Sequence, residues 1–327
     1  MIIINHHYSL TPEWQNEVIQ QTNARHINNE ITIVPEKLGD GTIYFTQVLP
    51  ALSVHLLDMV FTTGITINRY PSHQNLYVLQ YDISNKHNKL IIDNITHDIG
   101  NKGDIQLTVI DSQFPNTFIP VVNERTFGLR LTVDKDFLNL HLKNEDIFKA
   151  IEKNHSFNSF IDSETKILIY SLRNKSVFDI SYSSFLKGIT LKVFANFINT
   201  HKNKTQINNE IIKSDIEAIN KTTNYLAENL YGPFPSILLL SKMAGMSPTK
   251  YKLTFTKIHN TSPNKYFIKE KMIFSNKLLT SKDFTSLTEI AQLLNYSKVC
   301  YFTFQYFKVF QHKPCEDFKK KEIKNSP

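Results

Sequence analysis

The sequence predicts an α+β protein of more than one domain, in which a β-rich barrel or sandwich with added helices precedes an all-α region. Three observations carry this prediction. The chain has 327 residues, more than one compact domain usually holds. Short segments rich in β-branched and aromatic residues fill positions 31–133. After position 134, apolar residues recur at helical spacing instead.

Seven short segments support the β prediction for the first domain, residues 1–133. They are rich in Ile, Val, Thr, Tyr and Phe, and turn signals such as Gly100-Asn101-Lys102-Gly103 separate them. The segments span residues 41–48, 64–69, 76–82, 89–95, 104–110, 117–122 and 127–133. Many short strands at near-regular spacing are typical of a sandwich or a small barrel.

Residues 134–200 predict a helical segment that connects the domains or mediates dimerisation. Leu186, Ile189 and Val193 lie on one apolar face, which packs either against a second copy or against its own domain. Residues 201–210 are polar and predict a linker. Residues 211–327 carry only helical patterns and form the last predicted domain.

Positive charge is concentrated in this last domain. Residues 211–327 hold 18 Lys and 9 acidic residues, a net charge of +9, whereas the whole chain is +7 and residues 1–210 therefore carry −2. A nearly neutral front half and a basic back half indicate a polyanionic partner for the back half.

A helix, a tight turn and a second helix are predicted over residues 235–257. Gly245 suits the left-handed turn between the two helices. Ser247 is a good N-cap, and the proline that follows it is favoured at the first helical position. Tyr251 and Phe255 point inward, four residues apart, and leave a polar, basic outer face. The major groove of DNA admits such a helix.

The same pattern returns over residues 286–308, about fifty residues later. Ser286 and Glu289 match a capping box at the start of the first helix. Asn295 stands where a left-handed residue is needed, and Ser297 is expected to cap the second helix. Aromatic residues then repeat every four positions along the inner face. This unit is therefore a second predicted helix-turn-helix.

One helix over residues 263–280 is expected to join the two units, with Tyr266, Met272 and Leu279 inward. About seventeen residues at 1.5 Å each span roughly 26 Å. That length is suited to holding two recognition helices roughly 34 Å apart, which is one duplex turn. Two such units in a basic domain predict binding to double-stranded DNA.

Residues 211–318 resemble the DNA-binding domain of the AraC/XylS family. The runs that carry the resemblance are LSKMAGMSP at 240–248 with Phe255, TSPNKY at 261–266, Lys271-Met272, Leu278-Leu279, EIA at 289–291, NYS at 295–297, Tyr301-Phe302, Phe310 and Pro314. The resemblance implies a monomeric unit that reads two adjacent major grooves and controls transcription, most often by activation. It also implies a cupin-like N-terminal barrel that binds an effector or mediates dimerisation.

Several positions depart from the family pattern. Leu253 stands where an arginine is usual on the first recognition helix, and Lys271 replaces the arginine of the linking helix. Phe304 and Phe307 stand where Arg and Lys are common in the second recognition helix. We therefore expect the second recognition helix to depend more on DNA shape than on base contacts by charged side chains. Positions 260, 295 and 311 carry Asn, Asn and Gln in place of glycines.

Position matching with the family selects eight residues as candidate DNA contacts. Lysines can contact guanine edges or phosphates, and serines and threonines usually contact phosphates or either base type. The candidates are Thr249, Lys250, Lys252 and Lys257 in the first unit, and Ser297, Lys298, Cys300 and Thr303 in the second. Double-stranded DNA is the expected partner, and a small-molecule effector, RNA polymerase and a second copy of the chain are the other candidate partners.

Two alternatives remain open at this stage. A metal-dependent cupin enzyme fused to a DNA-binding domain would need clustered ligands such as His-x-His, whereas His55, His73 and His97 are scattered. A general DNA-coating protein would bind without sequence preference and with steep salt dependence. Because no catalytic motif is recognisable, we expect no enzyme activity, no catalytic residue, no metal site and no cofactor.

The chain is expected to be cytoplasmic. It has no run of eighteen apolar residues for a membrane span and no signal-peptide pattern at its start. Its two cysteines, Cys300 and Cys315, match neither a disulfide framework nor a metal-ligand spacing.

Overall fold

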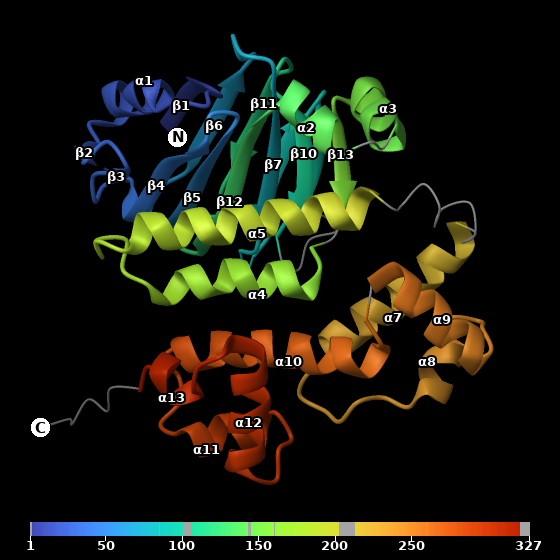
Figure 1. Cartoon of the computed structure of the whole chain (residues 1–327). Helices are drawn as coiled ribbons and strands as arrows, with labels where there is room; N and C mark the ends of the chain where they lie inside the picture. Colours follow the sequence, from blue (N-terminus) through green and yellow to red (C-terminus); the bar gives the residue numbers. More distant parts are fainter. Residues whose placement is uncertain are drawn as a thin grey trace, which may run out of the picture. The chain divides into compact units, whose positions relative to one another are not determined.

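The computed structural model describes residues 2–84, 86–100, 106–142, 145–159, 161–202, 213–259 and 261–320. The chain divides into two compact units (Figure 1). Unit 1 contains residues 1–161 and 175–204, and unit 2 contains residues 162–174 and 205–327. Within the described ranges, no helix is both long enough and apolar enough to cross a lipid bilayer.

Unit 1 is built on two β-sheets. The five-stranded sheet has the order β1 (Ile2–His7), β6 (Ile65–Tyr70), β11 (Asn116–Ile119), β8 (Asn88–Ile92) and β9 (Ile95–Ile99). The eight-stranded sheet has the order β13 (Ser156–Ser159), β10 (Leu107–Asp111), β7 (Leu76–Asp82), β12 (Arg125–Asp134), β5 (Leu52–Phe61), β4 (Gly39–Leu49), β3 (Ile31–Ile33) and β2 (Arg25–Ile27). Strands β1 and β6 run parallel, and the other pairs are antiparallel.

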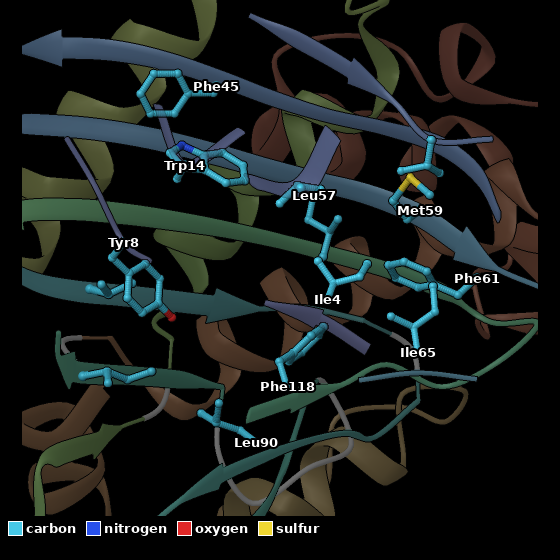
Figure 2. Packing of buried hydrophobic residues seen from close by; sticks show 14 of the residues in the cluster. Ile4, Tyr8, Trp14, Phe45, Leu57, Met59, Phe61, Ile65, Leu90 and Phe118 are labelled. Atoms are coloured by element: carbon cyan, nitrogen blue, oxygen red, sulfur yellow. The ribbon is translucent and has the colours of Figure 1, made fainter. Parts of the chain in front are cut away.

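Apolar side chains from both sheets meet in one core. Ile4 and Phe118 come from the smaller sheet, and Leu57 and Met59 come from the larger one (Figure 2). Phe118 is fully buried. Because each strand sends alternate residues into this space, the two sheets form a sandwich.

Helices complete unit 1. They are α1 (Glu13–Thr22), α2 (Lys135–His141), α3 (Glu145–Asn154) and α5 (Tyr182–Lys202). Trp14 of α1 enters the sandwich core, and α5 lies across the larger sheet (Figure 1). Val193 and Phe197 of α5 are buried, and the ring of Tyr182 lies 5.0 Å from that of Tyr44 on β4.

Unit 2 is all helical. Its elements are α4 (Ser163–Ser171), the 3-10 turn η1 (Leu172–Asn174), α7 (Lys213–Glu228), α8 (Ile237–Met243), α9 (Pro248–His259), α10 (Pro263–Thr280), α11 (Leu287–Leu293), α12 (Val299–Phe310) and α13 (Pro314–Asp317). One core forms around Leu240, Tyr251 and Phe255, and a second forms around Met272 and Phe302. Helix α10 contributes to both cores.

The predicted α+β architecture is confirmed, with sheets at the front of the chain and helices at the back. Most of the expected strands are present with shifted ends. The segment predicted as one strand over residues 89–95 is instead a hairpin of β8 and β9, because Asp93 and Asn94 take left-handed φ angles of 51° and 64° and reverse the chain. The linker predicted at residues 201–210 begins inside α5, and its remainder lies outside the described residues.

Candidate nucleic-acid interface

The first helix-turn-helix consists of α8 and α9. The Ser236 hydroxyl accepts a hydrogen bond from the Leu239 amide at 3.1 Å and caps α8. Gly245 has a φ of 63°, which turns the chain between the helices. The Ser247 hydroxyl accepts a bond from the Lys250 amide at 3.2 Å, so the expected cap of α9 is present. The predicted helix, turn and helix are confirmed here.

The outer face of α9 is polar and exposed. The four candidate contacts Thr249, Lys250, Lys252 and Lys257 are all exposed. Lys250 differs from Lys252 because its ammonium lies 2.8 Å from the carboxylate of Asp215 at the start of α7. Leu253 is 61% exposed on the same helix.

The second helix-turn-helix consists of α11 and α12. The Ser286 hydroxyl accepts a bond from the Glu289 amide, and the Glu289 carboxylate accepts one from the Thr285 amide. Asn295 has a φ of 61°, which confirms the left-handed turn. The expectation for Ser297 is wrong: the N-cap of α12 is Lys298, whose side chain makes no capping bond.

The outer face of α12 is more apolar than that of α9. Ser297, Lys298 and Cys300 are exposed and Thr303 is half-buried. Between and beyond these candidates lie large exposed rings: Tyr301, Phe304 and Phe307 are 53%, 51% and 45% exposed. The Lys308 ammonium lies 4.2 Å from the centre of the Phe304 ring. Only Phe302 and Tyr306 of this helix are fully buried, and both face the core.

Lys271 of α10 ties the two helix-turn-helix units together. Its ammonium donates to the carbonyl oxygen of Gly232 at 2.7 Å and to that of Leu294 at 2.8 Å. Gly232 precedes the first unit, and Leu294 ends the first helix of the second unit. The ammonium also lies close to the rings of Phe267 and Tyr296, and burial lowers the pKa of Lys271 to about 8. One side chain thus fixes both units to their shared helix.

Helix α4 also packs on α10, although it lies more than ninety residues earlier in the chain. The Lys166 ammonium lies 3.2 Å from a carboxylate oxygen of Glu270, and the Ser163 hydroxyl donates to the same carboxylate at 3.0 Å. The Lys277 ammonium faces the ring of Tyr170 at 5.7 Å. Sequence reasoning missed this contact, since a buried lysine and glutamate in separate helices leave no local pattern.

The histidines considered for a metal-dependent enzyme lie apart in the fold. His55 is buried on β5, His73 stacks on the ring of His7, and His97 lies on the edge strand β9. Across the described ranges, no group of three or more His, Cys, Asp or Glu side chains is placed to hold a metal ion. Both cysteines are exposed thiols.

No protein-family model and no curated protein matches the chain. Among solved structures, a transcriptional regulator with an AraC-type DNA-binding domain from Chromobacterium violaceum is 20% identical, over 31% of this chain and 88% of that one, with a TM-score of 0.29. A probable AraC family regulator from Rhodopseudomonas palustris is 22% identical, over 31% and 94% of the two chains, with a TM-score of 0.29. This chain resembles AraC-type regulators.

A longer match is to ToxT from Vibrio cholerae. ToxT is 14% identical, over 81% of this chain and 97% of that one, with a TM-score of 0.30. The arrangement of a sheet-rich unit followed by helices is the one expected from the AraC/XylS resemblance of the sequence motifs.

Proposed function

We propose that the protein is a sequence-specific DNA-binding regulator of transcription that acts as an effector-responsive activator. The observation that carries the proposal is the pair of helix-turn-helix units built on the single helix α10. Each unit has a buried inner face and an exposed outer face on its second helix. A rigid connection between two such helices suits the reading of two adjacent major grooves on one side of a duplex.

Charge and side-chain chemistry support the same proposal. The region that contains both units carries a net charge of +9, which favours the approach to phosphates. The DNA contacts that we propose are Thr249, Lys250, Lys252, Lys257, Ser297, Lys298, Cys300 and Thr303. An activator must also contact RNA polymerase, and a second copy of the chain would let two units bind neighbouring sites.

Binding of the full-length protein to duplexes tiled across the upstream region of its own gene tests the proposal. At physiological salt, we expect tight binding to one or two tiles and weak binding to the rest. The Lys252→Ala variant serves as the control for recognition by α9. Equal weak binding to every tile, with a steep fall as salt rises, would instead favour a general DNA-coating protein.

Two further measurements separate the finer parts of the proposal. Transcription from a template that carries the bound tile should rise when the protein is added with RNA polymerase, and a fall would identify a repressor. The molecular mass in solution, measured with and without the bound tile, tests for a homodimer. Neither measurement depends on knowing the effector.

A further inference from the structure

Four polar side chains meet on the inner side of the second recognition helix, α12. The Asp317 carboxylate on α13 accepts hydrogen bonds from the Tyr306 hydroxyl on α12 and from the Asn276 amide on α10, the latter at 2.9 Å. His312 Nε2 lies 2.7 Å from the same carboxylate oxygen. Asn276 Nδ2 also donates to the Tyr306 oxygen at 2.6 Å. This group, which we call the Asp317 cluster, joins α12 to both α10 and α13.

The Asp317 cluster is enclosed in the core of the second unit. Tyr306 and Asn276 are buried, and only 3% of the Asp317 side chain is exposed. The core residues around them are apolar. The His312 ring, in contrast, is 27% exposed. Solvent protons therefore have access to the cluster through His312.

The first unit fills the corresponding place with aromatic rings. Helix α10 follows α9 as α13 follows α12, and both α10 and α13 begin at a proline. Tyr266 and Asp317 each follow that proline by three residues, and Phe255 and Tyr306 each lie four residues before the end of their helix. The rings of Phe255 and Tyr266 make an edge contact at 5.5 Å. In the second unit a charged contact replaces this aromatic one.

Both ring nitrogens of His312 face oxygen atoms that can only accept a hydrogen bond. Nδ1 lies 2.9 Å from the carbonyl oxygen of Phe310, the last residue of α12, and Nε2 lies 2.7 Å from the Asp317 carboxylate. A neutral imidazole has one N–H group, whereas the imidazolium ion has two. The two bonds can therefore be made together only when His312 is protonated.

The other members of the Asp317 cluster do not take over this role. Burial and the charge of Asp317 raise the pKa of the Tyr306 hydroxyl above its ordinary value, so Tyr306 stays neutral near pH 7. The Asn276 side chain, from α10, is a neutral amide. The charge that changes in the cluster near neutral pH is therefore that of His312, because imidazole is the side chain that titrates there.

Charged side chains on the neighbouring elements make other contacts. The exposed Glu316 carboxylate of α13 accepts a bond from the Lys313 amide at 2.7 Å. The Lys308 ammonium of α12 lies 4.2 Å from the centre of the Phe304 ring. Within the described residues, the ion pair that His312 makes is with the Asp317 carboxylate.

We propose that Asp317 and His312 are positioning residues for α12, and that protonated His312 favours binding of the second unit to its half of the DNA site. Asp317 holds the Tyr306 hydroxyl, and Tyr306 resists rotation of α12 about its axis. Such a rotation would move Thr303 and Phe304 relative to the base edges. Recognition side chains need support to within about 0.5 Å and about 10–20°. The inference rests on the proposed function, because it concerns how α12 meets DNA.

Loss of the proton breaks one of the two bonds of His312. The neutral ring keeps its hydrogen on one nitrogen, and the other nitrogen then faces an oxygen lone pair. The chain between α12 and α13 is held less firmly, and with it Asp317. Because the well-held form of α12 carries the extra proton, affinity for the second half of the site should fall as the pH rises through the imidazole range.

The experiment uses full-length protein and three duplexes: the preferred tile and two derivatives, in each of which the bases that face one unit are scrambled. Fluorescence anisotropy measures the affinity lost on each scrambling at about pH 6 and at about pH 8. Protonation of other histidines strengthens phosphate binding to all three duplexes and cancels in the ratios. An iron chelate on the exposed Cys315, in a Cys300→Ser protein, cleaves the DNA near the second unit and identifies its half.

We expect the loss on scrambling the second half to be roughly three- to tenfold greater at the lower pH, which corresponds to one charge-assisted hydrogen bond. The loss on scrambling the first half should be the same at both pH values. His312→Gln keeps an amide that can donate to Asp317 but does not titrate, so both losses should be independent of pH. Asp317→Asn removes the charge that favours the imidazolium and should reduce the pH dependence.

His259→Gln is the matched control. His259 ends α9 in the first unit, and its Nε2 lies 3.1 Å from the Thr223 hydroxyl, which can donate or accept. This variant should keep the pH dependence of the second half. A DNA-free measurement accompanies it: the melting temperature of the unaltered protein, relative to that of His312→Gln, should be higher at the lower pH, where the ion pair is complete.

Three outcomes would overturn the positioning role. A loss on scrambling the second half that is the same at both pH values, in the unaltered protein, does so without any variant. A pH dependence that persists in His312→Gln assigns the effect to another group. A melting-temperature difference that is equal at both pH values shows that His312 makes no charge-dependent bond, whatever the DNA results are. Absence of a preferred tile at either pH is distinguishable from these, because it overturns the proposed function and the positioning role together.

Discussion

Lys166 and Glu270 form a buried ion pair, with Nζ 3.2 Å from Oε2 and only 6% and 10% of the two side chains exposed. The pair joins α4 to α10, the helix on which both helix-turn-helix units are built. The Ser163 hydroxyl donates to the same carboxylate. A buried charge that has lost its partner is strongly destabilising. Because moving α4 away from α10 would separate the two charges, the pair holds α4 against α10.

Replacing Glu270 with Leu should lower the free energy of unfolding of unit 2 by about 3–5 kcal/mol, because the Lys166 ammonium is left buried and unpaired. Chemical denaturation followed by circular dichroism measures the change. Glu164→Gln is the matched control: Glu164 pairs with Lys269 between the same two helices but is 70% exposed, so its loss should cost at most about 1 kcal/mol. The double variant Lys166→Met with Glu270→Leu should recover most of the stability, and a double variant as unstable as Glu270→Leu alone would contradict the account.

The burial of Lys271 should make stability depend on pH. Its folded pKa is about 8, below the ordinary value of 10.5 that the unfolded chain keeps. Between these values the unfolded state binds more protons, so the contribution of Lys271 to stability rises with pH across that window. Below pH 8 both states are protonated, and the full cost of burying the charge remains.

Comparison with Lys271→Met isolates this effect, because the tyrosines that titrate at high pH are common to both proteins. The free energy of unfolding of the unaltered protein, relative to the variant, should increase by roughly 1–2 kcal/mol between pH 7 and pH 9.5. If the free energy of unfolding of the unaltered protein, relative to that of the variant, stays constant or decreases over this pH range, burial of the Lys271 ammonium does not destabilise the fold.

The two lysines near the start of α9 should differ in their effect on DNA binding. Lys252→Ala should weaken binding to the preferred tile by roughly 1–3 kcal/mol if Lys252 reads a base. Lys250→Ala should cost less, because its ammonium must first leave Asp215. Fluorescence anisotropy at several salt concentrations measures both. No change in affinity for any duplex on replacing Lys252 would remove it from the interface.

The exposed rings of α12 predict an apolar mode of base contact. Phe304 and Phe307 offer no hydrogen bonds in the major groove, but an aromatic ring there can contact the methyl group of thymine. Replacing thymine by deoxyuridine under the second unit should weaken binding about fourfold, which corresponds to about 0.8 kcal/mol for one lost methyl contact. The same substitution should have no effect on Phe304→Ala, and an equal loss in that variant would exclude Phe304 as the contact.

Much of unit 2 could be predicted because its signals are local. Ser247 precedes a proline, Gly245 and Asn295 take the left-handed turns, and Tyr251 and Phe255 repeat at helical spacing. Each of these depends only on neighbours a few residues away. The eight DNA contacts remain predictions, since they depend on a partner and not on the fold of the chain.

The buried hydrogen bond from Arg69 to Asn116 and the contact of α4 with α10 could not be predicted in the same way, because each joins residues far apart in the sequence. A partial signal exists for Arg69. It lies two residues after Ile67 and four after Ile65 in a strand, which places all three on one face of the sheet. Isoleucines on that face indicate that it is buried, and a charged arginine among them is unusual for a buried face. Lys166 gives no such signal, because its partner Glu270 is 104 residues away.

Residues 162–174 belong to unit 2, while the stretches on both sides of them belong to unit 1, so the chain passes between the units three times. The helices after residue 211 therefore cannot be moved into another protein as one continuous cassette. A hybrid regulator made in that way would keep Glu270 and leave Lys166 behind. Two separate pieces of the gene must be exchanged together, and any natural recombination within this architecture meets the same requirement.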